Sequence, residues 1–500
     1  MKGIFVTRGK LLIKIILLVV IIASFIMLIG PIFIPKWYPS SDATKGFLAE
    51  DRNTVDVLAL GTSRMVFSSV PWVFWENYGI PMYSLAVEQQ PTIASYYLLQ
   101  ESLKTQNLKA VIIEVQGLNR SRSYQDGESY FRQNFDNLPF SLTKMETAVK
   151  LVSGSENQSL ISYGFPFLRY HDRWYELSEK DYTDIWPRSS FVKGGLPVFN
   201  TVGISLFPED YPISTGEPYV LPQDNERYLQ EIIELCQKED IALILFATPT
   251  FSWTQEQSEY YEKLSEQQEL VHFLEFNTYE AHEEIGFDIS TDFYDKGGHI
   301  NSIGAEKIMK KIGLFLSEKL GLTDHRGDPR YSSWDTSVEY VKLLENDWQL
   351  NLTDDFLNYL SLLDNPNYVI AISSADDATS GLSDEAYRLM ENIGLAGPTQ
   401  FRSSYVALIN GGIVICEEVD LDRIEFTTSI NGDQWSIVSV GGPKAALSSV
   451  TINRVPFAPS LRGLNIVVYN IQKKSVISVA NFDTFTTAMG RKYRSIEPIK

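Results

Sequence analysis

Apolar and polar positions alternate along the chain in a way that predicts a parallel sheet packed between helices. Three apolar runs without polar alternation, 55–61, 109–115 and 241–247, are typical of central strands covered on both faces. Stretches with apolar residues three and four positions apart predict amphipathic helices at 92–106, 225–240, 255–269 and 304–320. Strand and helix in alternation predict an α/β doubly wound parallel sheet over residues 50–322.

Two segments depart from this alternation. Residues 121–221 are rich in aromatic residues, Pro and Gly and lack a clear strand, so we interpret them as an insertion between two strands. Long insertions of this kind commonly serve sites. A helical stretch near 352–362 is followed by short β-type runs with Gly and Asn turns, which predicts a second, β-rich α+β domain over 351–490. Residues 323–350 are expected to link the two domains.

The N-terminal segment predicts a membrane anchor over residues 1–37. Residues 15–34 carry no charge and are nearly all aliphatic, which is enough to span a bilayer core of about 30 Å. Basic residues precede this run and the first acidic residue is Asp42, so the positive-inside rule places the N-terminus in the cytoplasm and the rest outside. A cleaved signal peptide is the alternative; the length of the run and the absence of a small-residue cleavage site oppose it.

Composition narrows the function classes. A chain of 500 residues with 44% hydrophobic residues is globular and too long for one core. The formal net charge of −20, without a basic stripe beyond the first residues, argues against nucleic acid as a partner. Cys236 and Cys416 are the only cysteines, so no cysteine-rich metal site is available, and one disulfide stays possible. The Asp-rich loops lack the spacing of zinc or calcium sites, and no metal is expected.

Candidate chemistry begins in "LALGTSRM", residues 58–65, where an apolar run stops at a glycine before Ser63. Ligands of doubly wound sheets bind at the carboxyl ends of strands, although a serine there can also be a plain helix cap. A nucleophilic serine needs a histidine oriented by a carboxylate. In "YDKGGHINSIG" His299 follows Asp295 in a glycine-rich loop before a helix, where a solvated histidine is the alternative. We expect Ser63, His299 and Asp295 to meet at one edge of the sheet.

These two stretches resemble the SGNH/GDSL hydrolase superfamily, especially its membrane-anchored branch related to alginate O-acetylation and lipoteichoic acid D-alanylation proteins. The resemblance spans about 55–320 and implies that Ser63 is the nucleophile and that His299, with Asn301 and Gly304 after it, belongs to the late catalytic block. The segments "YSLAVEQQP" and "VIIEVQGLN" look like the blocks that supply oxyanion donors. This likeness implies Asn119 as a side-chain donor.

Two positions depart from the family pattern. The glycine of the second block falls at Gln89, so the donor there would be a backbone N–H crowded by a side chain. Asp295 stands four residues before His299, whereas the family spaces them by two or three, and Asp292 is the poorer substitute. With Gln89 and Asn119, Arg64 is predicted as an oxyanion or substrate contact.

The insertion carries one further motif, "YHDRWYEL", which is also similar to the anchored branch. This similarity implies His171 and Arg173, together with their neighbours Asp172 and Trp174, as substrate contacts. The alternative is an aromatic-lined packing motif with no ligand.

The C-terminal region resembles the interleukin-like EMT inducer domain, also called the PANDER-like domain. The likeness rests on the Asp pair in "SADDATSG" and on "LRGLNIVVYN" followed by "NFDTF". It implies a glycan-recognition or interaction module. From the residues themselves, Arg462 could equally pair with Asp483 to staple adjacent strands, and Gly463 could supply a positive φ.

Together these features predict extracytoplasmic acyl transfer on a cell-surface glycopolymer, by an O-acetyltransferase or an acetylesterase. No cofactor is required. A membrane O-acyltransferase partner is implied for the transferase. The alternative is a catalytically inactive scaffold of the same fold that binds glycan or a membrane partner; Gln89 and the spacing of Asp295 favour it, and Ser63, His299 and Asn301 oppose it.

Overall fold

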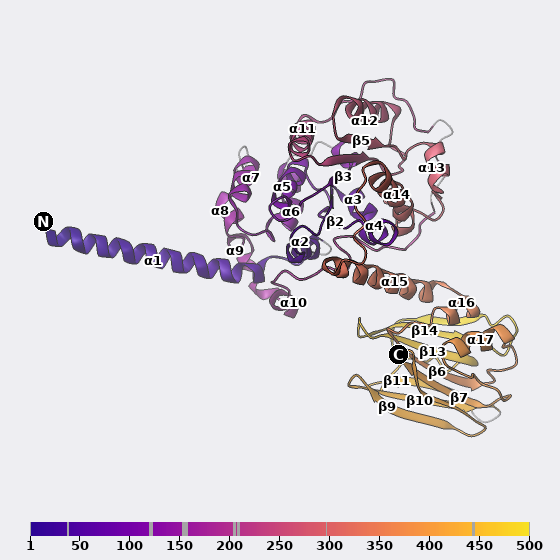
Figure 1. Cartoon of the computed structure of the whole chain (residues 1–500). Coiled ribbons are helices and arrows are strands. Elements are labelled where there is room, and N and C mark those ends of the chain that lie inside the picture. The colour runs from indigo at the N-terminus through magenta and orange to yellow at the C-terminus, as the bar shows by residue number, and fades with distance from the viewer. Residues whose placement is uncertain are drawn as a thin grey trace. The chain divides into compact units, whose positions relative to one another are not determined.

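The computed structural model describes residues 2–37, 40–119, 124–152, 159–203, 207, 211–296, 298–442 and 446–499. The chain divides into two compact units, Met1–Val341 and Lys342–Lys500. The first contains the N-terminal helix, the parallel sheet and the insertion, and the second contains most of the β structure (Figure 1).

A single long helix, α1 (Lys2–Phe33), opens the chain. Its segment Lys10–Phe33 is long and apolar enough to cross a membrane, a property that signal sequences share. After it comes α2 (Ser40–Ala49). The structure therefore contains one helix compatible with either a single-pass anchor or a signal sequence.

The sheet of the first unit has five parallel strands in the order β2-β1-β3-β4-β5. Their bounds are β1 (Val57–Leu60), β2 (Met82–Ser84), β3 (Ala110–Glu114), β4 (Ala242–Phe246) and β5 (Val271–Leu274). The expected parallel sheet is thus present, and its three long apolar runs form β1, β3 and β4. The strands β2 and β5 were not predicted.

Helices connect and cover these strands (Figure 1). They are α3 (Ser63–Ser68), α4 (Pro71–Tyr78), α5 (Thr92–Ser102), η1 (Val115–Asn119), α11 (Gln223–Lys238), α12 (Gln255–Gln267), α13 (Tyr279–Ile285), α14 (Ser302–Leu314) and η3 (Phe315–Lys319). The helices α5, α11, α12 and α14 lie where the periodicity of the sequence predicts them.

Alternate residues of each strand face opposite cores, as a pleated strand requires. Leu58 and Leu60 pack on the side of α5 and α11, whereas Val57 and Ala59 pack on the side of α3, α4 and α14. Both faces are buried, which explains why β1 has no polar alternation.

The insertion between β3 and β4 is helical over much of residues 124–183 and has no helix in the described residues 184–203 and 211–222. It contains α6 (Tyr124–Phe135), α7 (Leu142–Val152), α8 (Leu160–Gly164), α9 (Phe167–Tyr170), η2 (His171–Tyr175) and α10 (Glu179–Thr183). Several of these elements contact the end of α1: α9, η2 and α10 all pack against it. The insertion therefore packs against the C-terminal end of α1, where the apolar segment of this helix stops.

The segment expected to be a linker is largely helical. After η4 (Pro329–Tyr331), α15 (Ser332–Leu352) continues without a break across the division between the two units. Its first half packs into the first unit: Trp334 is buried, and Asp335 accepts a hydrogen bond from Trp75 at 2.7 Å.

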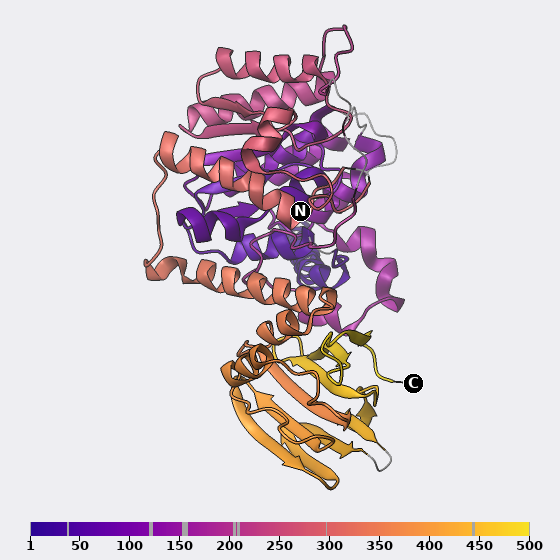
Figure 2. The same cartoon turned by 90° about the vertical axis from the view of Figure 1, so that its right-hand side faces the viewer.

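The second unit is a ten-stranded sheet with two short helices, and its strands curl around one another (Figure 2). The strand order is β12-β11-β10-β6-β13-β14-β15, with β7 between β6 and β8, and β9 on β10. The elements are α16 (Phe356–Ser361), β6 (Tyr368–Asp376), α17 (Asp384–Asn392), β7 (Ser404–Asn410), β8 (Ile413–Asp420), β9 (Ile424–Ile430), β10 (Asp433–Gly441), β11 (Leu447–Ile452), β12 (Val455–Pro456), β13 (Gly463–Asn470), β14 (Ser475–Phe482) and β15 (Arg491–Ser495). The predicted β-rich α+β domain is present and extends to β15.

Candidate active site

Ser63 lies directly after the first strand of the parallel sheet. The strand β1 ends at Leu60, Gly61 turns the chain with φ +144°, and Ser63 is the first residue of α3. A side chain at Gly61 would also crowd Met65, with its Cβ 3.1 Å away. Thr62 takes an extended conformation and makes no side-chain cap. The turn therefore presents Ser63, which is half-buried, at the carboxyl edge of the sheet.

His299 brings the two ends of the unit together. Its Nε2 lies 2.9 Å from Ser63 Oγ, although the residues are 236 positions apart. Its Nδ1 lies 2.7 Å from Asp295 Oδ2, and its backbone N–H donates to Asp295 Oδ1 at 3.1 Å. Both distances between side chains are within hydrogen-bond reach, as a nucleophile, base and orienting carboxylate require. The three residues predicted from the sequence thus form one hydrogen-bonded chain.

The four-residue spacing of Asp295 and His299 is absorbed by the loop itself. Phe293 pairs with Ile300 across it, and the N–H of Tyr294 donates to the His299 carbonyl at 2.8 Å. Gly298 has φ +87°, a conformation that side chains disfavour. The tight return of the chain lets one carboxylate hold both the ring and the backbone of His299.

Asp292, the substitute considered from the sequence, has a different role. It is fully buried, and its carboxylate binds Lys307 at 2.7 Å and the N–H of Asp288 at 2.7 Å. Gly304 packs against its backbone, where a Cβ would lie 2.7 Å from the Asp292 carbonyl oxygen. Asp292 therefore stabilises the start of α14, and Asp295 is the carboxylate that faces His299.

Asn301 fixes the position of that helix relative to the loop. Its side-chain oxygen accepts from the N–H groups of Ile303 and Gly304, each at 3.1 Å, which caps α14. Its amide donates to the Thr291 carbonyl at 2.7 Å. These bonds give a physical reason for the "HINSIG" motif: the asparagine joins the loop of His299 to the helix that follows it.

Aromatic packing holds the imidazole in place. The Phe67 ring stacks on His299 with centroids 4.7 Å apart, and Tyr294 lies 4.9 Å beyond Phe67. The His299 and Asp295 side chains are still 26% and 38% exposed. The ring is therefore fixed on one face while the reacting atoms remain accessible to a ligand.

Arg64 contacts the histidine loop. Its guanidinium donates to the Gly298 carbonyl at 2.6 Å and to Thr250 Oγ1 at 3.4 Å. The geometry thus ties α3, which carries the serine, to the loop that carries the base. The predicted contact of Arg64 with oxyanion or substrate stays a prediction.

Glu114 is a buried carboxylate that the sequence reading did not single out. It ends β3 and is 1% exposed. Burial raises its pKa, an effect that the nearby Arg64 guanidinium and hydrogen bonds from Thr248 partly oppose. A glutamate at the end of the apolar run "AVIIE" was the available signal, because a charge at the carboxyl end of a buried strand faces the site edge.

Gln89 occupies a backbone conformation that favours glycine. It lies in the turn after β2 with φ +54°, in the left-handed region. The turn is adjacent to the serine loop, because the N–H of Val87 donates to the Gly61 carbonyl at 3.2 Å. The turn next to the serine loop therefore has a backbone conformation that favours glycine, with a glutamine side chain on it.

Asn119 ends η1 and is the last residue of the described segment 40–119. Its Oδ1 accepts a hydrogen bond from the Tyr219 hydroxyl. Two residues earlier, Gly117 packs on Thr62, where a Cβ would lie 2.4 Å from the Thr62 methyl carbon. The "GLN" block therefore touches the serine loop through its glycine, and the role of Asn119 as an oxyanion donor stays a prediction.

His171 and Arg173 lie in the insertion near the end of α1. The Arg173 guanidinium donates to the Phe33 carbonyl at 2.6 Å and binds Asp181 at 3.2 Å. His171 is exposed and lies 3.1 Å from Asp172. None of these partners belongs to the loops that carry Ser63 and His299. Arg173 thus satisfies the last turn of α1, and substrate contact by either residue stays a prediction.

In the second unit, the residues of the "RGLN" motif satisfy one another. Arg462 binds Asp483 through two hydrogen bonds, at 2.9 and 2.8 Å, and Gly463 has φ +94°. A Cβ at Gly463 would lie 2.1 Å from the Phe482 carbonyl oxygen. The structural staple expected from the sequence is confirmed.

The aspartate pair of the same domain is also engaged. Asp377 is fully buried and accepts from the backbone N–H groups of Thr379 and Arg402, each at 3.1 Å. Asp376 lies 3.5 Å from the Arg402 guanidinium. Within the described ranges, no group of three or more His, Cys, Asp or Glu side chains is arranged to hold a metal ion.

Comparison with known proteins bears on the second unit. Residues 338–413 match the model of the family described as interleukin-like EMT inducer. The match runs from α15 to the start of β8 and supports the PANDER-like resemblance of the C-terminal domain. No curated protein matches the chain.

Proposed function

We propose that this protein is a serine acyltransferase or esterase anchored on the extracytoplasmic side of a membrane. The observation that carries the proposal is the hydrogen-bonded chain from Ser63 through His299 to Asp295. Its order and distances are those that nucleophilic acyl transfer needs. A cell-surface glycopolymer is the proposed acceptor, by the SGNH resemblance of the two motifs.

In the first half-reaction, Ser63 Oγ attacks the carbonyl carbon of an acyl ester while His299 Nε2 takes the hydroxyl proton. Asp295 holds the Nδ1–H tautomer and stabilises the imidazolium that forms. Backbone N–H groups beside Ser63, with Asn119, stabilise the oxyanion. The C–O bond to the leaving alcohol breaks, and His299 returns the proton to that alcohol, which leaves an acyl-Ser63 ester.

In the second half-reaction, an acceptor hydroxyl gives its proton to His299 and attacks the acyl-Ser63 carbonyl. A sugar hydroxyl as acceptor makes the protein an O-acetyltransferase, and water makes it an acetylesterase. A membrane O-acyltransferase partner would supply the acyl group in the first case. The same residues perform both reactions.

The anchor part of the proposal rests on contacts at the end of α1. Ile34 is 5% exposed, Phe33 packs edge-on against Phe167 at 4.9 Å, and Arg173 binds the Phe33 carbonyl. Removal of a signal peptide would delete these contacts. Retention of α1 is therefore consistent with how the insertion is built around it.

A catalytically inactive scaffold is the second candidate. Gln89 favours it, because a side chain stands at the turn where the family has glycine. In this alternative the fold binds glycan or a membrane partner without turnover.

The test uses the full-length chain in detergent, because truncation before residue 37 would remove the contacts of Phe33 and Ile34. A fluorophosphonate probe and p-nitrophenyl acetate are applied to the native chain and to Ser63→Ala and His299→Ala. Labelling and acetate release that disappear in both variants support the enzyme. Ser265→Ala, at a partly buried serine on α12, is the matched control and should behave like the native protein. A folded native chain without labelling favours the scaffold.

A further inference from the structure

A pocket of about 210 Å³ lies between the outer end of α1 and the insertion, among side chains that the proposed reaction does not use. Its wall from α1 and the residue after it is apolar and consists of Ile26, Met27, Gly30, Pro31 and Ile34. The opposite wall comes from the loops around α7, α8 and α9, including Phe140, Phe165 and Pro166. Two lysines, Lys45 and Lys144, and one carboxylate, Asp136, also line it.

The apolar wall lies at membrane depth if α1 is the anchor. The apolar segment of α1 ends at Phe33, and Ile26 stands seven residues earlier. At a rise of 1.5 Å per residue this is about 10 Å into the bilayer. The pocket therefore extends from the headgroup region into the outer hydrocarbon layer.

Lys144 is a buried cation without an ion pair. Lys144 lies on α7 and is 3% exposed. Its Nζ donates to the Leu138 carbonyl at 2.8 Å. Among the described residues, no carboxylate oxygen lies within 4.0 Å of it. Asp136, the nearby opposite charge, is already bound by Arg132 and Tyr170. Burial lowers the pKa of Lys144 to about 8, so it remains mostly charged at neutral pH.

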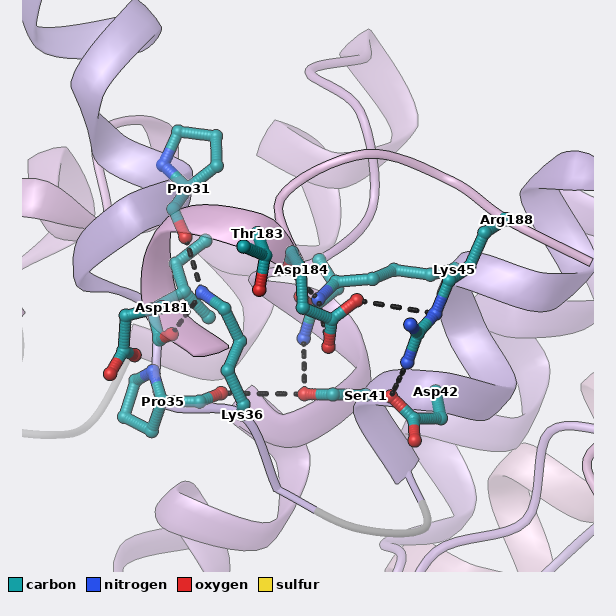
Figure 3. A network of polar contacts seen from close by, with 12 residues as sticks. Pro31, Pro35, Lys36, Ser41, Asp42, Lys45, Asp181, Thr183, Asp184 and Arg188 are labelled. Atoms are coloured by element: carbon teal, nitrogen blue, oxygen red, sulfur yellow. Dashed lines mark hydrogen bonds and ion pairs between the residues drawn. The ribbon is translucent and has the colours of Figure 1, made fainter. Parts of the chain in front are cut away.

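Lys45 stands in the network of polar contacts that Figure 3 shows from close by. It binds Asp184 at 3.3 Å, and Arg188 binds the same carboxylate at 3.4 Å. Arg188 also reaches Asp42 at 3.7 Å. Next to this network the Lys36 ammonium donates to the carbonyls of Pro31 and Ile34, at the end of α1. Two carboxylates therefore serve Lys45 and Arg188, so Lys45 is a paired cation beside the pocket, whereas Lys144 is buried without an ion pair among the described residues.

The outside of the insertion beside the pocket is apolar. Exposed hydrophobic side chains stand on α7, α8 and α9 or just before them: Phe140, Leu142, Leu160, Ile161 and Leu168. Trp174 and Tyr175 are exposed directly after Arg173, which binds the end of α1. Aromatic residues at this level are typical of the interface between membrane and water. These exposed side chains offer apolar contacts for lipid on the elements that line the pocket.

We propose that the pocket binds one anionic phospholipid of the outer leaflet, with the phosphate at Lys144 and Lys45 and an acyl chain along Ile26, Met27 and Gly30. The inference rests on the membrane anchor proposed above. At about 210 Å³ the pocket is smaller than closed small-molecule sites, which occupy roughly 300–1,000 Å³. The smaller volume here fits part of an amphiphile whose remaining chain stays in the bilayer.

The test uses the full-length chain in nanodiscs of equal phosphatidylglycerol and phosphatidylcholine, with bound lipid identified by native mass spectrometry after release. The native chain is expected to retain phosphatidylglycerol over phosphatidylcholine by about tenfold, the effect of one charge-assisted hydrogen bond. Lys144→Met should lose this preference. Lys150→Met, an exposed lysine on the same helix, should keep it.

A second variant blocks the pocket without touching its charge. A Cβ at Gly30 meets no atom within 4 Å, so Gly30→Leu fills the space without displacing a neighbour and should abolish lipid retention. Equal retention of both lipids by the native chain, unchanged preference in Lys144→Met, or retention in Gly30→Leu would overturn the proposal. Displacement of the lipid by inorganic phosphate alone would show a simple anion site and overturn it too.

Intact mass and probe labelling separate this proposal from the proposed function. If the intact mass includes residues 1–37 but no lipid is retained, the proposed lipid site alone is contradicted. If the intact mass lacks these residues, the proposed anchor is contradicted. Fluorophosphonate labelling of Ser63 reports on the catalytic proposal in the same samples, independently of bound lipid.

Discussion

The triad loop and the Arg462 motif use similar residues but differ in where their hydrogen bonds end. In the C-terminal domain, the Arg462 guanidinium donates two hydrogen bonds to Asp483, one to each carboxylate oxygen. In the first unit, hydrogen bonds join Asp295 to His299 and His299 to Ser63, whose side chain is half-exposed. A charged motif whose groups are all satisfied internally stabilises a fold, whereas a chain that ends in an accessible nucleophile is equipped to react.

The largest expected effect is that of Asp295→Asn, which should lower the rate of probe labelling and of p-nitrophenyl acetate hydrolysis by about 10³–10⁴-fold. The amide keeps the shape of the carboxylate, but its NH₂ group can donate to Nδ1 and so favour the wrong tautomer of His299. Asp292→Asn is the matched control: it should reduce stability through Lys307 and leave the rate per folded molecule unchanged. The opposite pattern would assign the triad to Asp292.

Gly463→Ala should destabilise the C-terminal domain by about 2–3 kcal/mol and leave labelling of Ser63 intact. The new Cβ would collide with the Phe482 carbonyl oxygen in addition to the strain of a φ of +94°. Gly432→Ala provides the comparison, because Gly432 has φ +92° but open space around it. Chemical denaturation of the full chain measures both; equal losses would show that close packing at Gly463 contributes nothing.

Arg462→Met should cost the same domain only about 1 kcal/mol, since Arg462 is 42% exposed and solvent screens its charge. The Arg462 hydrogen bonds hold the pKa of Asp483 below its usual 3.8. Because the pKa of Asp483 is lower in the folded than in the unfolded chain, the ion pair stabilises the fold at pH values above the unfolded pKa. This stabilisation is lost as the pH falls through the folded pKa. The difference between native and variant chains should therefore be constant above about pH 5 and shrink below pH 4. Denaturation across this range measures it; a constant difference would exclude the ion pair as its source.

The smallest expected effect is that of Gln89→Gly, which should stabilise the first unit by about 0.5–1 kcal/mol by relieving the left-handed backbone. It should also raise the rate of acetate release, because the N–H beside Ser63 loses a crowding side chain. Gln89→Ala removes the side chain but keeps the backbone strain, so it separates the two effects in parallel denaturation and rate measurements. A lower rate in Gln89→Gly would give the glutamine side chain a positive role.

The parts of the fold that the sequence predicted are those with a continuous local pattern. The strands β1, β3 and β4 are buried on both faces, so every position is apolar and the runs are visible in the sequence. The strand β2 has only three residues, "MYS", and β5 is an edge strand whose last three residues are half-buried. Neither produces a distinctive period. The helix α15 was assigned to a linker because it packs in two halves against two units, which blurs a single apolar face.

For the candidate site, the sequence located Ser63, His299 and Asp295, which the structure brings together, but not the residues that contact them. Ser63 and His299 stand in glycine-containing turns next to predictable elements, and the topology of the sheet brings such turns together. Phe67 and Glu114 support them from α3 and from the end of β3, at separations that no local pattern encodes. Arg64 was placed in the site, yet its carbonyl partner at Gly298 follows only from the three-dimensional loop.

The bond between Arg173 and the last carbonyl of α1 also bears on how the insertion is held. Together with the edge-on contacts of Phe33 with Phe167 and of Trp37 with Tyr170, it joins the insertion directly to the end of α1. A domain on a slack tether samples a hemisphere of positions, whereas contacts of this kind restrict that freedom. If α1 is the anchor and Ser63 the nucleophile, as proposed above, the reach of the reaction from the membrane would be set by the protein rather than by diffusion.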